Sequence, residues 1–285
     1  MAVARERCLY CGQVLPSPLV PRLPIPDPPG SVAPEAPGPA RTLVILDLDA
    51  ADPERLESVL GLATYEAALL ARRRGFHLHR LLAPELAEAE ARRLHAGGLR
   101  VETVAEEELR DPPLRALGGE RGRGSLTLRT EEGPVTLHRG DLLIVVRGPI
   151  ARQYQPVFRR RRVDTASLEE GYRVHLHRRA DRRPVEIDIA NFEFGTAGAG
   201  STRLELEAWV DEIRAEVAED DGFRRLPPAF GVAEPEPRGP LAAASALGRA
   251  GRGERAEGES VVLDNAAQFR FYSAWRAALE RRRAG

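Results

Sequence analysis

Apolar and polar positions form clear blocks over residues 41–105. A short apolar run, Leu43–Leu46, predicts a strand, and Asp52-Pro53 predicts the start of a helix, with Asp as its cap and Pro in its first turn. By the same periodicities a second helix is expected over 64–74, a strand over 76–82, a helix over 84–95 and a strand over 99–104. The predicted order is βααβαβ, in a segment the size of one small domain.

The pattern over residues 114–218 is mostly that of strands. Two alternating segments, 125–129 and 135–138, are joined through Glu131-Glu132-Gly133, which predicts a hairpin. Further strands are expected over 141–146, 172–178 and 184–190, followed by a helix over 204–217. The predicted fold class is therefore α+β: a small βααβαβ module followed by a β-rich PH-like or small barrel domain with a helical cap.

One segment of the module resembles a known family. Gly61–Ala67 reads Gly-Leu-Ala-Thr-Tyr-Glu-Ala, and a charged helix then runs into Gly97-Gly98 and a Val-Glu strand. This pattern resembles the C-terminal domain of the bacterial ribosomal stalk protein, whose fold the Clp protease adaptor (ClpS-like) family shares. The resemblance implies a module that binds other proteins without catalysis. Leu48 stands where the adaptors have Asn, and the chain contains no Lys, so the adaptors' amino-terminus anchor and the stalk's Lys-rich face are not carried over.

Composition divides the rest of the chain. A Cys-containing tip over residues 1–15 is followed by a proline-crowded stretch, 16–40, which is expected to be a disordered linker. A second flexible linker is expected over 222–260, because Pro, Gly and Ala dominate there. The final segment, 261–285, predicts a separate C-terminal helix.

The charge balance excludes a strong net field. The chain has 43 acidic and 42 basic residues, every base an Arg, and a formal net charge of −1. Nucleic acid or an anionic membrane is therefore not attracted to the molecule as a whole. No apolar run approaches the roughly 18 residues of a membrane span, and the first residues lack the apolar core of a signal peptide. We expect a cytoplasmic protein, and the Arg-for-Lys bias suggests a GC-rich bacterial genome.

Cys8 and Cys11, in the sequence Cys-Leu-Tyr-Cys-Gly, form half of a zinc ribbon. Two thiolates at this spacing can bind one Zn²⁺, but a structural site needs four ligands. Another copy of the chain in a homo-oligomer, histidines or a partner could complete the site. The alternatives are a relic without metal and, less in keeping with the neighbouring proline-rich stretch, a redox dithiol.

Two His-x-His pairs could also chelate metal. His77 and His79 lie on one face of a predicted strand, and His175 and His177 lie on one face of another. The residues between them are apolar and are expected to face the core. We therefore expect all four histidines on the outer, solvated face rather than in a metal site.

Arg159, Arg160, Arg161 and Arg162 could hold phosphates, although no aromatic residues interleave with them and a solvated loop is the favoured reading. Asp47 and Asp49 follow the first strand, where carboxylates can bind Mg²⁺, but the Lys and the motif of a phosphotransfer enzyme are missing. These patterns do not identify a reaction.

Phe269, Tyr272 and Trp275 form a stripe on the last predicted helix. Such a stripe packs into the chain's own core or docks on a partner protein. The function predicted from sequence is a non-enzymatic adaptor or regulatory protein that binds other proteins. The alternatives are a nucleic-acid-associated protein that uses the Cys tip and the Arg run, and an enzyme with an unrecognised site.

Overall fold

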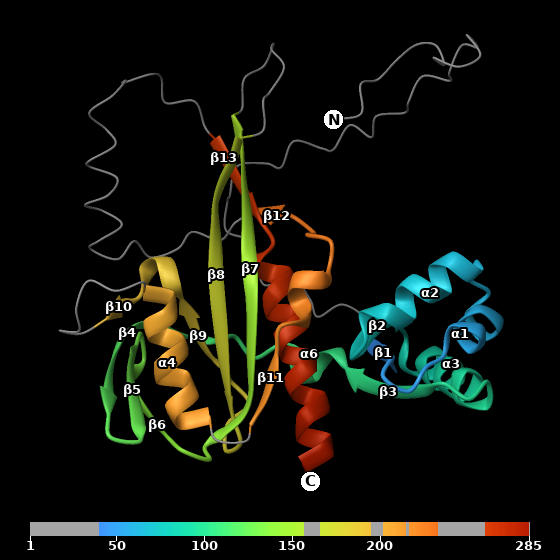
Figure 1. The fold of residues 1–285 in the computed structure, drawn as a ribbon, viewed down its shortest axis with the longest axis horizontal. Coiled ribbons are helices and arrows are strands. Elements are labelled where there is room, and N and C mark those ends of the chain that lie inside the picture. The colour runs from blue at the N-terminus through green and yellow to red at the C-terminus, as the bar shows by residue number, and fades with distance from the viewer. Residues whose placement is uncertain (1–39, 157–165, 195–201, 215–216, 233–259, 285) are drawn as a thin grey trace. The chain divides into compact units, whose positions relative to one another are not determined.

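The computed structural model describes residues 40–156, 166–194, 202–214, 217–232 and 260–284 of the chain (Figure 1). Over these residues the protein is a mixed α+β structure with five α-helices and two β-sheets. The predicted fold class is confirmed at this level.

The first part of the described chain has the predicted βααβαβ order. Its elements are β1 (Thr42–Asp47), α1 (Pro53–Leu60), α2 (Thr64–Arg73), β2 (Phe76–Leu82), α3 (Pro84–Ala96) and β3 (Arg100–Ala105). Strand β1 is central, and β2 and β3 pair with it antiparallel on either side. The run Leu43–Leu46 is apolar throughout because both faces of β1 are buried.

Local signals fix the helix ends of this module. Asp52 Oδ1 accepts a hydrogen bond from the backbone N–H of Arg55 at 2.9 Å, so the predicted cap is present. Gly61, with φ of 66°, ends α1 in the left-handed region that glycine adopts without strain. Arg74 and Gly75 both have positive φ, and β2 begins directly after them.

The second sheet contains ten of the described strands. They are β4 (Leu114–Gly122), β5 (Ser125–Thr130), β6 (Gly133–His138), β7 (Leu142–Pro156), β8 (Ala166–Arg178), β9 (Val185–Asp188), β10 (Glu193–Phe194), β11 (Ala218–Asp220), β12 (Gly231–Val232) and β13 (Ser260–Asp264). The helices beside them are α4 (Thr202–Arg214) and α6 (Ala266–Ala284), with 3₁₀ turns η1 (Glu106–Leu109), η2 (Ile189–Asn191) and η3 (Gly222–Arg225).

This sheet is open and mixed, so the small-barrel prediction is wrong. The strand order is β12-β13-β7-β8-β9-β4-β5-β6, with β10 beside β4 and β11 beside β7. The pairs β4–β9, β4–β10 and β7–β11 are parallel, and the others are antiparallel. The sequence pattern did not reveal strand β4. It pairs with β9 on one side and with β5 on the other, so that β6 forms the edge of the sheet. The described strands therefore do not close on themselves.

Helices cover both faces of the second sheet (Figure 1). On one face, Trp209 and Ile213 of α4 share a core with Val145 of β7. On the opposite face, Phe269 of α6 shares a core with Ile144, since neighbouring residues of a strand point to opposite faces.

Helix α6 is an inner layer between the two sheets. Its core with the second sheet also contains Leu43 and Ile45 of β1 and Val104 of β3. The alternate β1 residues Val44 and Leu46 pack in a separate core with α1, α2 and α3. The C-terminal helix, which the sequence predicted as a separate element, is thus built into the centre of the structure.

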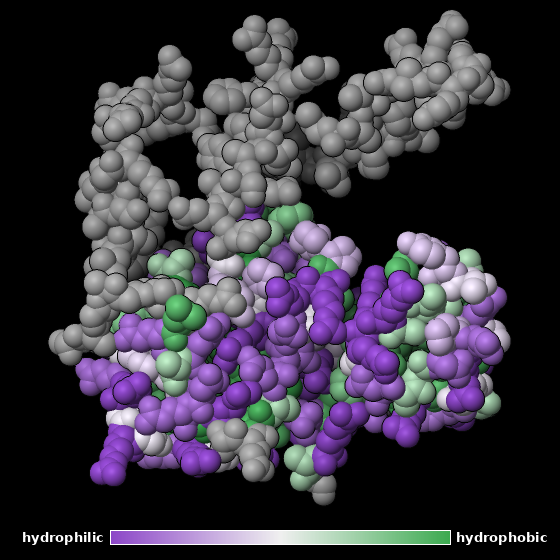
Figure 2. Space-filling view, viewed as in Figure 1, coloured by the Kyte–Doolittle hydropathy of each residue, from purple (hydrophilic) through white to green (hydrophobic). Residues whose placement is uncertain are grey.

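The segment 222–260 begins differently from the flexible linker that was predicted. Residues 222–225 form η3, and 231–232 form β12 at the sheet edge beside β13. No helix within the described residues is long and apolar enough to cross a membrane. Polar side chains cover most of the face shown in Figure 2, and the large apolar side chains exposed on the described surface are Tyr65, Leu69, Leu86 and Leu204.

Candidate functional site

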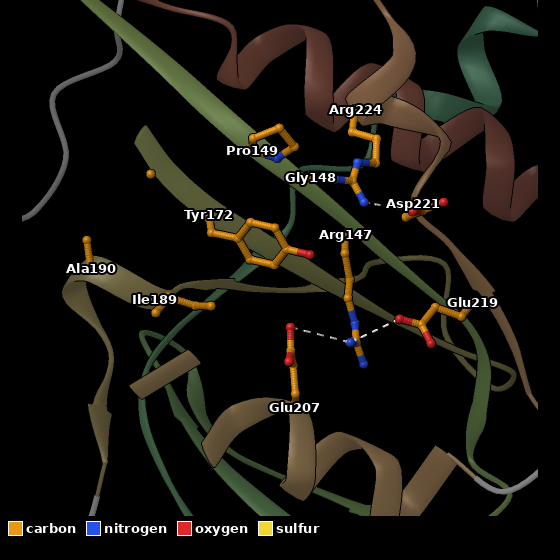
Figure 3. A pocket seen from close by; sticks show the side chains of 11 residues that line it. Arg147, Gly148, Pro149, Tyr172, Ile189, Ala190, Glu207, Glu219, Asp221 and Arg224 are labelled. Atoms are coloured by element: carbon orange, nitrogen blue, oxygen red, sulfur yellow. Dashed lines mark hydrogen bonds and ion pairs between the residues drawn. The ribbon is translucent and has the colours of Figure 1, made fainter. Parts of the chain in front are cut away.

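A pocket of about 710 Å³ lies on the α4 side of the second sheet (Figure 3). Its floor is formed where β7 and β8 run side by side, with Pro149 paired to Tyr172. Helix α4, the β11–η3 segment and η2 supply the rest of the lining. A volume of this order is typical of sites for small ligands or for side chains of a partner.

Arg147 is the central charged group of this pocket. Its side chain is only 8% exposed, and its Nη1 lies 3.0 Å from Glu219 and 3.9 Å from Glu207 (Figure 3). Its Nη2 lies 3.8 Å from Asp211. Glu207 and Asp211 are four residues apart on α4 and so share one face of the helix. Carboxylates from α4 and β11 therefore surround a single buried guanidinium.

Apolar side chains form the opposite wall. Figure 3 shows the ring of Tyr172 extending toward Arg147, with Ile189 and Pro149 on the side away from the carboxylates. Gly148 lies between Arg147 and Pro149, and a Cβ at this position would come within 2.5 Å of Phe223 on the other face of the sheet. The glycine allows the α6-side aromatic residues to pack directly against the strand beneath the pocket.

The lining carries more acid than base. Its carboxylates are Glu207, Glu219 and Asp221, and its guanidiniums are Arg147 and Arg224. Arg224 Nη1 lies 3.4 Å from Asp221, so that pair largely satisfies itself, and Glu219 binds Arg214, outside the lining, at 2.7 Å in addition to Arg147. A surplus carboxylate beside an apolar wall favours a ligand group that is cationic at one end and aliphatic along its stem.

Sequence reasoning did not identify these residues. Arg147 directly follows the apolar run 142–146, and a charge at that point of a buried strand was a usable signal. The matched spacing of Glu207 and Asp211 was a second one. Their convergence with Glu219 required the parallel pairing of β11 with β7, which no local pattern predicts.

A second polar cluster lies beneath α6. His175 Nε2 lies 3.0 Å from Glu186 Oε2, His175 Nδ1 lies 2.9 Å from Ser273 Oγ, and His177 Nε2 lies 2.7 Å from the same Ser273 oxygen. Both histidines are 1% exposed. The prediction that His175 and His177 lie on a solvated outer face is therefore wrong, because α6 covers that face of β8.

The partners of these histidines fix their tautomers when both rings are neutral. Glu186 accepts only, so His175 carries its proton on Nε2 and accepts from the Ser273 hydroxyl at Nδ1. Ser273 has then used its proton, so His177 must donate from Nε2 to the Ser273 oxygen. His177 Nδ1 is left as a buried acceptor with no hydrogen-bond partner among the described residues.

Burial sets the protonation of this cluster. Burial, followed by the charge of His175, lowers the pKa of His177 well below its ordinary value, and burial also lowers the pKa of His175. Burial alone would raise the pKa of Glu186, but hydrogen bonds from His175 and Arg270 hold it below the usual range. Ser273, His175 and Glu186 resemble a nucleophile with its base, yet Ser273 is 0% exposed within α6, so its hydroxyl acts as a structural bridge.

The other His-x-His pair does not form one site either. His79 Nε2 lies 3.1 Å from Glu90 Oε1, and both side chains are largely buried. The pKa of His77 is lowered to about 4, first by burial and then by the charges of Arg73 and His79. Over the described part of the chain, no group of three or more His, Cys, Asp or Glu side chains is arranged to hold a metal ion.

Asp47 and Asp49 have structural partners. Asp49 Oδ1 accepts from the backbone N–H of Gly75 at 2.9 Å, and Asp47 Oδ2 lies 3.3 Å from Arg283 on α6. These contacts tie the end of β1 to the α2–β2 connection and to the last helix.

Phe269, Tyr272 and Trp275, the stripe proposed for partner binding, are buried, with exposures of 0%, 5% and 2%. They pack in the core between the two sheets, and the Tyr272 hydroxyl donates to Asp220 Oδ1 at 2.7 Å. The stripe therefore meets the chain's own sheets. Cys8 and Cys11, proposed for zinc, and Arg159, Arg160, Arg161 and Arg162, proposed for nucleic acid, lie outside the described residues.

Comparisons of the chain with protein-family models, curated proteins and solved structures found no match. The resemblance of residues 41–105 to the stalk and adaptor families accordingly stays a prediction.

Proposed function

We propose that this protein is a non-enzymatic adaptor or regulatory protein, and that the pocket of Figure 3 receives a basic side chain from a segment of a partner protein. The observation that carries the proposal is the acid surplus of a pocket that also has an apolar wall.

The carboxylates are held in a fixed arrangement. Glu207 and Asp211 project from one face of α4, and Glu219 is fixed by the pairing of β11 with β7. Arg147 is almost fully buried, and its guanidinium lies between Glu207 and Glu219, so it holds these two carboxylates in place (Figure 3). Such a preformed site binds with a smaller entropic cost than a flexible one.

The apolar wall suits the stem of Lys or Arg. Tyr172, Ile189 and Pro149 line the side away from the acids. Long basic side chains lay their methylene groups on apolar surface while the charged head contacts acidic groups, and the face of an aromatic ring attracts the cation further. An acidic or purely apolar side chain would satisfy only one of the two walls.

The test is fluorescence anisotropy with purified full-length protein and four labelled nonapeptides that differ only at the central residue: Lys, Arg, norleucine or Glu. We expect the Lys and Arg peptides to bind at least about tenfold more tightly than the norleucine peptide, about 1.4 kcal/mol, with the Glu peptide weakest. Raising the salt concentration should weaken the binding of the basic peptides.

A matched pair of variants localises the effect. Glu207→Gln removes one carboxylate of the pocket and should weaken the Lys peptide by about fivefold or more, within the range measured for exposed to partly buried ion pairs. Glu205→Gln, on the same helix but outside the lining, should leave the affinity unchanged. Equal affinities for all four peptides, or equal losses in both variants, would contradict the proposal.

A further inference from the structure

A separate cavity, of about 280 Å³, lies on the α6 side of the second sheet. Its walls come from the connection between η1 and β4, from β8 and the turn that follows it, and from α6. Four of its lining residues are arginines, Arg110, Arg182, Arg270 and Arg281. The cavity does not share a lining residue with the pocket of Figure 3.

The ion pairs around this cavity leave it with a surplus of positive charge. Arg270 is paired with Glu186 at 2.8 Å, and Glu108 of the lining is paired with Arg282 at 2.8 Å. Among the described residues, Arg110, Arg182 and Arg281 have no ion pair to a carboxylate within 4.0 Å. The lining also contains Asp111, and the charges of Asp181 and Asp111 act on Arg281 without forming an ion pair with it.

The guanidinium of Arg281 is partly buried and lies close to the positive charge of Arg182. Its Nη2 donates to the backbone carbonyls of Asp181, at 2.7 Å, and Arg182, at 3.3 Å. Burial, and next the charge of Arg182, lower the pKa of Arg281 below its ordinary value. A guanidinium that is partly removed from water beside a second one is stabilised by any anion placed between them.

His177 supplies an independent observation. It lines the cavity, it is 1% exposed, and its Nδ1 has no hydrogen-bond partner among the described residues. Its Nε2–H is committed to Ser273 at 2.7 Å, so Nδ1 of the neutral ring offers a lone pair. A buried acceptor without a donor is unfavourable, and a ligand that donates a hydrogen bond to it would remove that cost.

We propose that this cavity binds a protonated oxyanion, either hydrogen phosphate itself or the singly protonated phosphoryl group of a small phosphate monoester. The second pKa of such a monoester is about 6. The guanidiniums of Arg182 and Arg281 donate to the charged oxygens, and the P–OH group donates to Nδ1 of His177. Sulfate has the same shape but carries no proton near neutral pH, so it leaves Nδ1 without a donor.

Isothermal titration calorimetry of the full-length protein at fixed ionic strength tests this site with inorganic phosphate, glycerol 3-phosphate and sulfate, at a pH of about 6.5, where a substantial share of the monoester still carries its P–OH proton. We expect saturable binding of one phosphate-bearing ligand per chain and at least about tenfold weaker binding of sulfate. Tighter binding of inorganic phosphate assigns the free ion as ligand, whereas tighter binding of glycerol 3-phosphate assigns a monoester. Equal affinity for sulfate and phosphate, or no saturation by about 10 mM, overturns the proposal.

Two charge-matched variants separate a built site from general attraction of anions. Arg182→Gln removes an exposed guanidinium of the lining, and we expect it to weaken phosphate binding by about tenfold, the equivalent of about 1.4 kcal/mol. Arg123→Gln makes the same change of net charge in the exposed β4–β5 turn, outside the lining, and should have no effect. Equal losses in the two variants overturn the proposal and leave the peptide pocket on the α4 side untouched.

Discussion

Replacing Ser273 with Ala removes a single oxygen atom, and we expect this change to lower the stability of the protein substantially. The Ser273 hydroxyl donates to Nδ1 of His175 and accepts from Nε2 of His177, and all three side chains are buried. The substitution therefore leaves two buried imidazole nitrogens without partners. Each unsatisfied group costs about 1–3 kcal/mol, and the higher helix propensity of Ala returns about 0.5 kcal/mol.

We expect the free energy of unfolding of Ser273→Ala to fall by about 2–5 kcal/mol. Urea denaturation followed by circular dichroism measures it, and with a slope near 3 kcal/mol/M the midpoint should fall by about 1 M. Ser58→Ala is the control, because Ser58 is an exposed helical serine that bonds only the carbonyl of Arg55, at 3.1 Å, and its loss should cost less than about 0.5 kcal/mol. A Ser273→Ala protein within about 0.5 kcal/mol of the parent would refute the hydrogen-bond assignment.

Gly148→Ala should cost about 1–3 kcal/mol in urea denaturation, because its Cβ would lie 2.5 Å from Phe223, whereas Gly171→Ala on the neighbouring strand, 3.5 Å from Ile150, should be tolerated. Stability should fall by up to about 3 kcal/mol from pH 6.5 to 5.5, because the folded pKa values of His77, His175 and His177 lie below the unfolded value of about 6.5 and each group contributes up to about 1 kcal/mol as the unfolded chain binds more protons; denaturation curves that coincide at the two pH values would contradict this. Asp52→Ala should cost about 1 kcal/mol through loss of the α1 cap, and an unchanged thermal midpoint would argue against that cap.

The module of residues 42–105 was predictable because short-range features decide its elements. Asp52 caps α1 by accepting a hydrogen bond from the N–H of Arg55, three residues later, and Gly61 ends the same helix. The apolar run Leu43–Leu46 marks a strand that is buried on both faces. Each signal lies within a few residues of the element that it defines. The β5–β6 hairpin was found for the same reason.

The second sheet was harder because its neighbours come from distant parts of the chain. Strand β9 pairs in parallel with β4, and β13 pairs with β7 more than a hundred residues away. Short strands such as β10, β11 and β12 have two or three residues, too few for any periodicity. The barrel prediction failed at this point, because the local pattern showed neither the parallel β4–β9 pairing nor the two edges, β12 and β6, at which the sheet ends.

The wrong prediction for His175 and His177 and the failure to predict the pocket around Arg147 have the same cause. The alternation of β8 was read as one apolar face and one solvated face, an assumption that holds only when a single face of a sheet is covered. Here α4 covers Val174 and Leu176, while α6 covers His175 and His177. A polar residue on a doubly covered strand must find a partner within the protein, and Ser273 and Glu186 meet that requirement.

The double covering of the second sheet also connects the fold to both proposed binding sites. A doubly covered sheet forces its charged residues either into satisfied networks or to the margins of the covering helices, where a cavity can open beside them. Arg147 lines the 710 Å³ pocket on the α4 side of the sheet. His177 lines the 280 Å³ cavity on the α6 side. The two sites differ in sign because α4 and β11 bring carboxylates, whereas the turn after β8 and the end of α6 bring arginines. Their ligands are therefore expected to carry opposite charges, and binding at one face can be tested without disturbing the other.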